Sequence, residues 1–190
     1  MNANPGGTRT ALMAAAGTCK LPCIEVLLDH GADANTVIPD TGTTALMMSA
    51  RLGAKLCVDR LLRGGASCNA ADHNGWTALR FATEMGPRAE STVRVLLSHG
   101  ADPSLAASDG LSPLGVALER GDAVLSGPME EFEAAGARLA ARGGATAKAA
   151  VAAARFEAEA EGRAGDDIEG RAARIAGEWS AAGVTAGKRG

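Results

Sequence analysis

One short stretch is written three times along this chain at a nearly constant spacing. LLDHGADAN occupies residues 27–35, LLRGGASCN residues 61–69 and LLSHGADPS residues 96–104. A second motif stands upstream of each copy: TALMAAA starts at residue 10, TALMMSA at 44, TALRFAT at 77 and a looser SPLGVAL at 112. These starts differ by 44 − 10 = 34, 77 − 44 = 33 and 112 − 77 = 35 residues. A period near 33 is typical of an array of stacked helical repeats.

Each unit is interpreted as helix–turn–helix. A Thr or Ser caps a short first helix by accepting a hydrogen bond from an exposed backbone N–H. A second helix carries apolar pairs such as Leu61 and Leu62, and a glycine then ends it in the left-handed conformation. The third and fourth units hold extra residues around MGPRAES and LSGP, which suit the turn between the two helices better than a helix interior. One such helix pair cannot bury its own apolar side, so several copies must stack.

These motifs resemble the ankyrin repeat, whose pattern is G-x-T-P-L-H-x-A, a second helix, and L-L-x-x-G-A-D-x-N. The resemblance covers about residues 4 to 137 and implies an all-α solenoid with short finger turns. Its array domain spans 1–136, with repeats at 4–35, 36–69, 70–104 and 105–136. Departures from the pattern occur where Ala replaces the usual proline, at Ala11, Ala45 and Ala78. The usual histidine, and with it the family's Thr–His hydrogen bond, is replaced at Met13, Met47, Arg80 and Gly115.

The chain changes character from Arg138 onward, where Ala, Gly and mixed charges dominate. Because alanine favours helix, residues 137–190 are expected to form an Ala-rich helical tail, with helices near 145–161 and 167–182. Helical spacing places Ile168, Ala172, Ile175 and Trp179 on one side, which predicts a cover for the open end of the array. The alternatives are a degenerate fifth repeat that starts at Thr146 and a mobile linker.

Composition excludes several classes of function. The formal net charge is −3 and no basic face is evident, so nucleic acid is not an expected partner. No apolar run approaches the ~18 residues of a membrane span, and the N-terminus does not read as a signal peptide. The cysteines at 19, 23, 57 and 68 form no paired CxxC motifs, which favours an intracellular, cytoplasmic location. We interpret them as buried structural thiols and expect a monomer that needs no metal or cofactor.

No arrangement of side chains predicts catalysis. His30 and His99 share the slot before the glycine that ends the second helix, where a cation interacts with the helix's negative end. This recurrence indicates a scaffold role and leaves His73 as the histidine free for a ligand. The pair Gly64–Gly65 lacks the lysine and the strand–loop–helix context of a phosphate-binding loop. The chain is therefore predicted not to be an enzyme.

The family resemblance implies a candidate modification site at two asparagines. Asn35 and Asn69 each follow a leucine by eight residues, as in ankyrin repeats that resemble substrates of a hypoxia-linked asparagine oxygenase. The alternative is an asparagine whose side chain bonds the finger backbone, and we favour that structural interpretation.

Helical phase predicts a surface for a partner. With the buried leucine of a first helix at zero degrees, the residues two and six positions later lie near 200 and 240 degrees. Met48, Leu52, Phe81 and Met85 therefore point away from the core, toward the concave groove that the resemblance implies. Trp76 overhangs this groove, while Asp72 and His73 form a polar rim. An apolar patch of this kind indicates a partner site, unless the tail folds back into the groove.

The sequence thus predicts a non-enzymatic module that binds an unidentified protein through its groove and fingers. The alternative is a structural or targeting adaptor, a fragment of a larger polypeptide in which the tail helix makes the contact.

Overall fold

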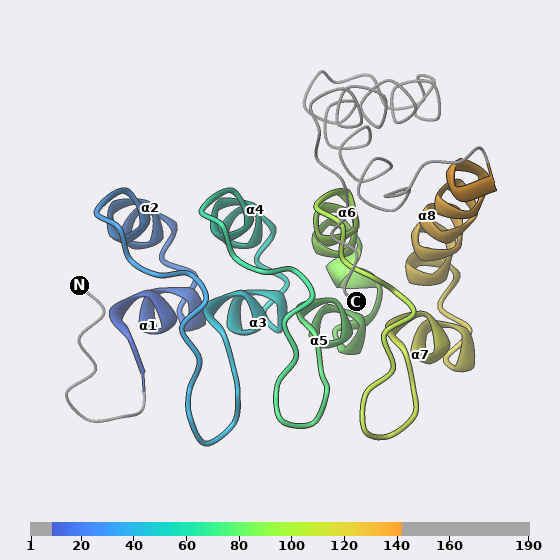
Figure 1. Ribbon diagram of the computed structural model, residues 1–190, viewed down its shortest axis with the longest axis horizontal. Coiled ribbons are helices and arrows are strands. Elements are labelled where there is room, and N and C mark those ends of the chain that lie inside the picture. The colour runs from blue at the N-terminus through green and yellow to red at the C-terminus, as the bar shows by residue number, and fades with distance from the viewer. Residues whose placement is uncertain (1–8, 142–190) are drawn as a thin grey trace, which may run out of the picture.

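The computed structural model describes residues 9–141, and the side chains of its last helix as far as residue 134. Four first helices form one row and four second helices form another, with a finger extending from each junction between repeats (Figure 1). The first helices are α1 (Ala11–Gly17), α3 (Ala45–Ala50), α5 (Ala78–Glu84) and α7 (Pro113–Glu119). The second helices are α2 (Leu21–Asp29), α4 (Lys55–Arg63), α6 (Glu90–Ser98) and α8 (Ala123–Ala141), with a 3-10 helix, η1 (Gly86–Ala89), before α6.

This arrangement confirms the predicted all-α solenoid. Residues 9–141 contain no strand, and their only β pairings are isolated bridges at Val37–Thr44 and Ala71–Thr77, within the fingers. The residues predicted for the tail helices, 145–161 and 167–182, lie outside the part of the chain that the structure describes.

Each first helix begins at the hydroxyl residue that the sequence predicts. The side chains accept a hydrogen bond from the backbone N–H three residues on, at 3.0–3.3 Å; these caps are Thr10, Thr44, Thr77 and Ser112. In the first two repeats the missing histidine has a substitute, because the Sδ atoms of Met13 and Met47 accept from the Thr N–H at 3.5 and 3.4 Å. A thioether is a weak acceptor, so this bond replaces the usual one only in part.

The turn after each first helix requires a left-handed residue. Gly53, Gly86 and Gly121 take this conformation, with φ of 64°, 66° and 63°. The equivalent position of the first repeat is Cys19, nine residues after its cap, and it has φ 53°. A side chain disfavours this region because Cβ approaches the following carbonyl oxygen. The first repeat therefore carries local strain that the other three avoid.

Replacing Cys19 with glycine is expected to stabilise the array. Relief of the left-handed strain gives about 1–2 kcal/mol, and the greater freedom of glycine in the unfolded chain removes part of it. The net gain of about 0.5–1 kcal/mol is measured by urea unfolding of Cys19→Gly beside Cys19→Ala, which keeps the Cβ and removes the thiol. Equal stability of the two variants would contradict the conformational explanation.

The prediction that all four cysteines are buried structural thiols is wrong in part. Cys57 is buried and its burial raises the pKa of the thiol, an effect that Cys19 and Glu25 reinforce, as expected of a structural cysteine. Cys19 and Cys23 are instead exposed. Cys23 and Cys57 occupy the same position of their helices, but α2 packs on one side of α4, and no described element packs on the corresponding side of α2. Cys68 is half-buried and its Sγ lies 3.3 Å from the carbonyl oxygen of His99.

Polar side chains tie consecutive repeats together. Asn35 donates to the carbonyl of Gly65 at 2.9 Å and accepts from the N–H of Ser67 at 2.8 Å. Asn69 repeats the pattern on Gly100 and Asp102, at 3.0 and 2.8 Å. These bonds bear out the structural interpretation of both asparagines, with the backbone of the next repeat as the partner.

The histidines that precede the terminal glycines act within their own helices. The Nδ1 atoms of His30 and His99 lie 2.8 and 3.0 Å from the carbonyl oxygens of Val26 and Val95, four residues back. Gly31 and Gly100 then take positive φ, 79° and 87°, as the sequence predicts. The recurring histidine ring therefore adds a second contact to a carbonyl that already accepts a hydrogen bond from the backbone N–H of the same histidine.

The fourth repeat differs from its prediction. The Gly-Pro of MGPRAES lies in η1, between two helices as expected, but Gly127 and Pro128 lie inside α8. The turn at Gly121 already stands nine residues after its cap, as in the other repeats, so the extra residues lengthen the second helix instead of the turn. Gly136 is also helical, and α8 continues to Ala141, past the boundary expected at residue 136.

Candidate functional site

The aromatic rings of the third repeat meet at the base of its finger, the loop formed by residues 66–77. The centroids of Trp76 and Phe81 lie 5.1 Å apart with their planes tilted by 58°, and both side chains are half-buried. The guanidinium carbon of Arg80 lies 4.5 Å from the centroid of the Trp76 ring. A cation over the face of an indole is attracted by its quadrupole, so Arg80 helps to hold the Trp76 ring in place. Trp76 and Phe81, predicted as site residues, are therefore side by side.

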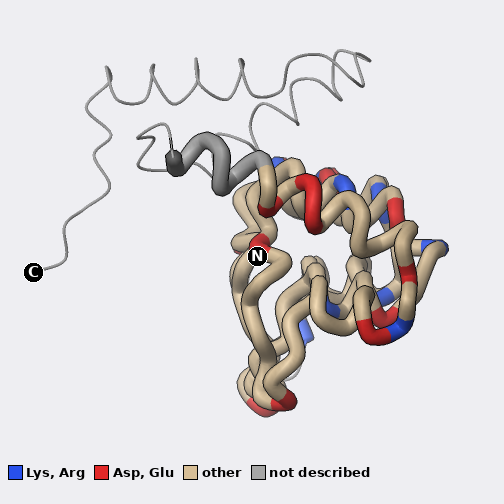
Figure 2. The backbone as a smooth tube through the Cα atoms, turned by 90° about the vertical axis from the view of Figure 1, so that its right-hand side faces the viewer, with Lys and Arg blue, Asp and Glu red and all other residues tan. Residues whose placement is uncertain are grey.

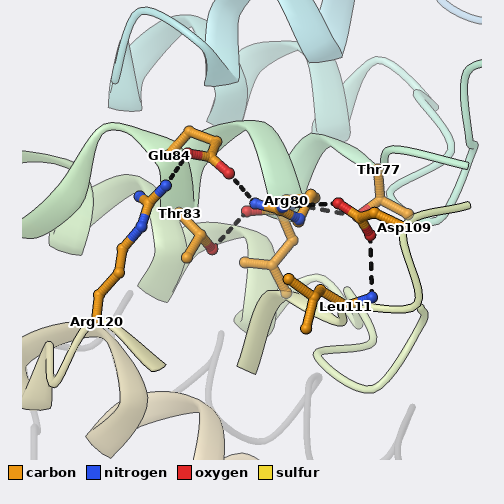
Figure 3. A network of polar contacts seen from close by, with 8 residues as sticks. Thr77, Arg80, Thr83, Glu84, Asp109, Leu111 and Arg120 are labelled. Carbon is orange, nitrogen blue, oxygen red and sulfur yellow. Dashed lines mark hydrogen bonds and ion pairs between the residues drawn. The ribbon is translucent and has the colours of Figure 1, made fainter. Parts of the chain in front are cut away.

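Arg80 is the centre of a network that crosses from the third to the fourth repeat (Figure 3). It is 4 % exposed, and its guanidinium donates to Glu84 on the same helix and to Asp109 in the next finger, the latter at 3.2 Å. Glu84 also accepts from Arg120, at the end of α7. The Nε atom of Arg80 is buried without a hydrogen-bond partner. The sequence showed Arg80 only as a substitute for the usual histidine, although its spacing from Glu84 is that of a helical ion pair.

The two carboxylates of this network have lowered pKa values. Burial alone would raise the pKa of Glu84, but the hydrogen bonds from Arg120 and Arg80 outweigh it and hold the pKa below its ordinary value of 4.5. The backbone N–H of Leu111, with Arg80 as a further donor, lowers the pKa of Asp109. Both groups are thus stabilised as anions by the folded array.

Glu84 makes the stability of the chain depend on pH. Its folded pKa lies below the unfolded value, so its contribution is complete above about pH 5 and is lost as the pH falls through the folded pKa. Replacing it with glutamine removes this titration. We therefore expect Glu84→Gln to be less stable than the wild type at pH 7, and the difference to narrow below pH ~4. Urea unfolding from pH 7 to pH 3 measures this, and a difference that stays constant would contradict it.

The prediction that Met48 belongs to the partner surface is wrong. It is 4 % exposed and belongs to the core, whereas helical phase places it on the open side of α3. A Cβ added at Gly17 of α1 would lie 3.7 Å from its Sδ atom, so the thioether lies next to a residue without a side chain. The burial of the fourth residue after each cap varies along the array: Ala14 of the first repeat is exposed, Phe81 of the third is half-buried and Val116 of the fourth is buried. Met48 is therefore not available to a partner.

Leu52 and Met85 do lie at the surface, at 44 % and 40 % exposure. They occupy the same position in neighbouring repeats, eight residues after the caps Thr44 and Thr77, and α3 packs against α5. The chain thus presents two large apolar side chains in register, and Met85 follows the half-buried Phe81 by four residues, which places both on the same side of the helix. We call Leu52, Trp76, Phe81 and Met85 the apolar face.

The two residues predicted as a polar rim differ in role. The Asp72 carboxylate accepts from the backbone N–H groups of Asn74 and Trp76, both at 2.8 Å, so it positions the tryptophan. His73 is exposed, and its backbone N–H donates to the carbonyl of Thr41 in the preceding finger at 2.9 Å. A Cβ at Gly42 would come within 2.8 Å of the His73 ring, so the ring lies over that glycine.

The fingers carry charge of one sign. The three loops at 32–44, 66–77 and 101–112 contain five aspartates and no lysine or arginine: Asp33, Asp40, Asp72, Asp102 and Asp109. Figure 2 shows acidic residues at the tips of the fingers, on the side away from the second helices. The three fingers, including the one that holds Trp76, are therefore acidic.

Within residues 9–141, no group of three His, Cys, Asp or Glu side chains is placed to hold a metal ion. None of the helices in that same range is both long and apolar enough to cross a membrane.

Comparison with known proteins agrees with the period and the fold. Residues 1–72 match the family described as "Ankyrin repeats (3 copies)", and residues 74–108 match "Ankyrin repeat". An ankyrin repeat-containing protein of Treponema pallidum is 36 % identical over 91 residues, 48 % of this chain and 30 % of that protein. "Ankyrin repeat and KH domain-containing protein mask-1" of Caenorhabditis elegans is 34 % identical over 113 residues, 59 % of this chain and 4 % of that protein.

A human relative extends the comparison. "Ankyrin repeat and SOCS box protein 6" is 37 % identical over 92 residues, 46 % of this chain and 22 % of that protein. The chain thus spans less than a third of each of these three relatives.

Proposed function

Because the chain belongs to the ankyrin-repeat family, whose members are generally modules for protein–protein interaction, we propose that it binds a partner protein through the apolar face. One observation carries this proposal: Leu52 and Met85 are exposed in register on neighbouring repeats, and Met85 stands one helical turn after Phe81. Exposed apolar side chains that gather on one face of a protein are typical of an interaction surface. Arg80 and Asp72 position Trp76, while His73 and the finger aspartates form the polar surroundings.

Trp76 is the expected anchor of this surface. Interface energy concentrates in a few side chains, with Trp, Tyr and Arg most frequent among them. The Trp76 ring is held by Phe81 and Arg80, so it loses little freedom when a partner covers it. This pre-organisation favours affinity.

The test begins with the full chain as bait, and mass spectrometry identifies the protein it retains. Affinity is then measured for the wild type and for Trp76→Ala, Met85→Ala and the control Leu56→Ala. Leu56 is 65 % exposed on α4, in the other row of helices. We expect Trp76→Ala to cost about 2 kcal/mol of binding, roughly thirtyfold in affinity, and Leu56→Ala to cost nothing measurable.

Folding is checked by thermal unfolding of each variant. Met85 is exposed, so Met85→Ala tests the surface even if Trp76→Ala destabilises the third repeat. If both variants stay folded and bind with wild-type affinity, the apolar face is not the partner site. If Trp76→Ala unfolds the array while Met85→Ala binds normally, Trp76 belongs to the core.

A second candidate function is an adaptor region of a longer polypeptide, in which the tail makes the contact. It is favoured by the relatives, whose matching repeats are a small part of much longer proteins. The same retained protein, tested for binding to Trp179→Ala and to Trp76→Ala, separates the two candidates. Loss of binding in Trp179→Ala alone supports the tail.

A further inference from the structure

An apolar stripe is exposed on α7, in the last described repeat. Leu114 and Leu118 stand four residues apart, so they lie one above the other on the same side of the helix. The equivalent pairs of the other repeats are Leu12–Ala16, Leu46–Ala50 and Leu79–Thr83, and every one of these residues is at most 2 % exposed. Leu114 is only half-buried, and Leu118 is 52 % exposed. We call Leu114 and Leu118 the end stripe.

The difference has a simple origin. In α1, α3 and α5 these positions are covered by packing that includes the next repeat, as the contact of Ser49 Oγ with the carbonyl oxygen of Ala16 illustrates at 3.4 Å. No described element follows α8 in the array. The residue at the second position is also larger here, since leucine replaces the Ala or Thr of the other repeats. Terminal repeats of soluble arrays usually turn a polar side outward, and this one does not.

We propose that the end stripe is the docking site for a segment of the same chain, residues 168–179. This segment carries Ile168, Ala172, Ile175 and Trp179 at helical spacing. A stripe of this kind fits against a stripe of two leucines on a neighbouring helix. The tail then caps the array and removes the end stripe from water.

The length of the connecting chain agrees with this occupant. Residues 142–167 separate α8 from the segment and can span up to roughly 85 Å, while the 19-residue α8 is about 28 Å long. The connection can therefore return from the end of α8 to α7.

Trp179 supplies a direct test in the full chain. The protein has two tryptophans, so Trp76→Phe leaves Trp179 as the single indole reporter. In this background we expect Trp179 to emit at short wavelength and to be protected from acrylamide. Adding Leu118→Glu is expected to shift the emission to longer wavelength and to abolish the protection. Adding Leu56→Glu, at an exposed leucine of α4, is expected to change neither.

A second variant keeps the proposal testable if Leu118→Glu unfolds the fourth repeat. Ile175→Asp alters the segment and leaves every described residue unchanged. Hydrogen exchange of the peptide that contains α7 is expected to accelerate by about tenfold in Ile175→Asp, while the peptide that contains α1 keeps its rate. Circular dichroism of both variants verifies that the helices of the array remain.

Three results would overturn the proposal. Trp179 could be fully quenched by acrylamide in the Trp76→Phe chain, which means that nothing covers it. The exchange rate of α7 could be unchanged in Ile175→Asp, which means that the segment does not contact α7. Protection of Trp179 that appears only as the mass doubles with concentration would make a second copy the occupant. The partner affinity of the apolar face does not enter any of these measurements.

Discussion

Leu61→Ala is expected to lower the free energy of unfolding by about 2–5 kcal/mol, because a truncated core leucine loses its burial and leaves a cavity. Leu61 is fully buried on α4, at the centre of the array, where α2 and α6 pack on either side of its helix. In a repeat array, stability is a sum of repeat and interface terms, so damage at an interior repeat weakens two interfaces together. Urea unfolding followed by circular dichroism measures the loss.

Cys68→Ser is the matched comparison for Leu61. Cys68 is half-buried near the start of the second finger, and serine retains a donor for the carbonyl of His99, which now lies 3.3 Å from Sγ. The loss should therefore be smaller than for Leu61→Ala, about 1 kcal/mol or less. Equal losses in the two variants would mean that Leu61 does not have the core role assigned to it.

Glu84→Ala is expected to cost roughly 2–3 kcal/mol, because it removes one of the two carboxylates that neutralise the buried Arg80. Breaking a buried ion pair typically costs ~3–5 kcal/mol, and the loss here is smaller since Asp109 still accepts from Arg80. Arg120 also loses its carboxylate, so the contact between the third and fourth repeats weakens. The change is measured by urea unfolding at pH 7.

Combining Glu84→Ala with Arg80→Met tests whether the buried charge of Arg80 causes this cost. The first two repeats already hold methionine at this position, Met13 and Met47, and both are buried. Replacing a buried ion pair with a well-packed apolar side chain is often neutral or stabilising. The double variant Glu84→Ala/Arg80→Met should therefore be more stable than Glu84→Ala alone. If the double variant is the less stable of the two, the cost of Glu84→Ala does not come from the buried charge of Arg80 that has lost one carboxylate.

The helices, their caps and most of the core could be predicted because they repeat in phase. These features depend on interactions within a few residues of the chain, and similar residues recur with a period of about 33 residues. They are the caps, the glycine turns and the buried Ile24, Val58 and Val93. When the same local interactions recur in every repeat, each repeat is expected to fold in the same way. The extra residues of the fourth repeat did not recur, and there the sequence alone placed a turn where α8 continues.

The tertiary structure decided what lies opposite each side chain. Met48 became core because Gly17 of the preceding repeat leaves room for it, and Cys23 and Cys57 differ in burial although they occupy the same position of their helices. Arg80 acquired Asp109, a partner 29 residues away, which no periodicity within one repeat could indicate. Helical phase tells which direction a side chain takes from its own helix. Whether water or another repeat meets it depends on contacts between residues distant in sequence, and only the packed array determines those.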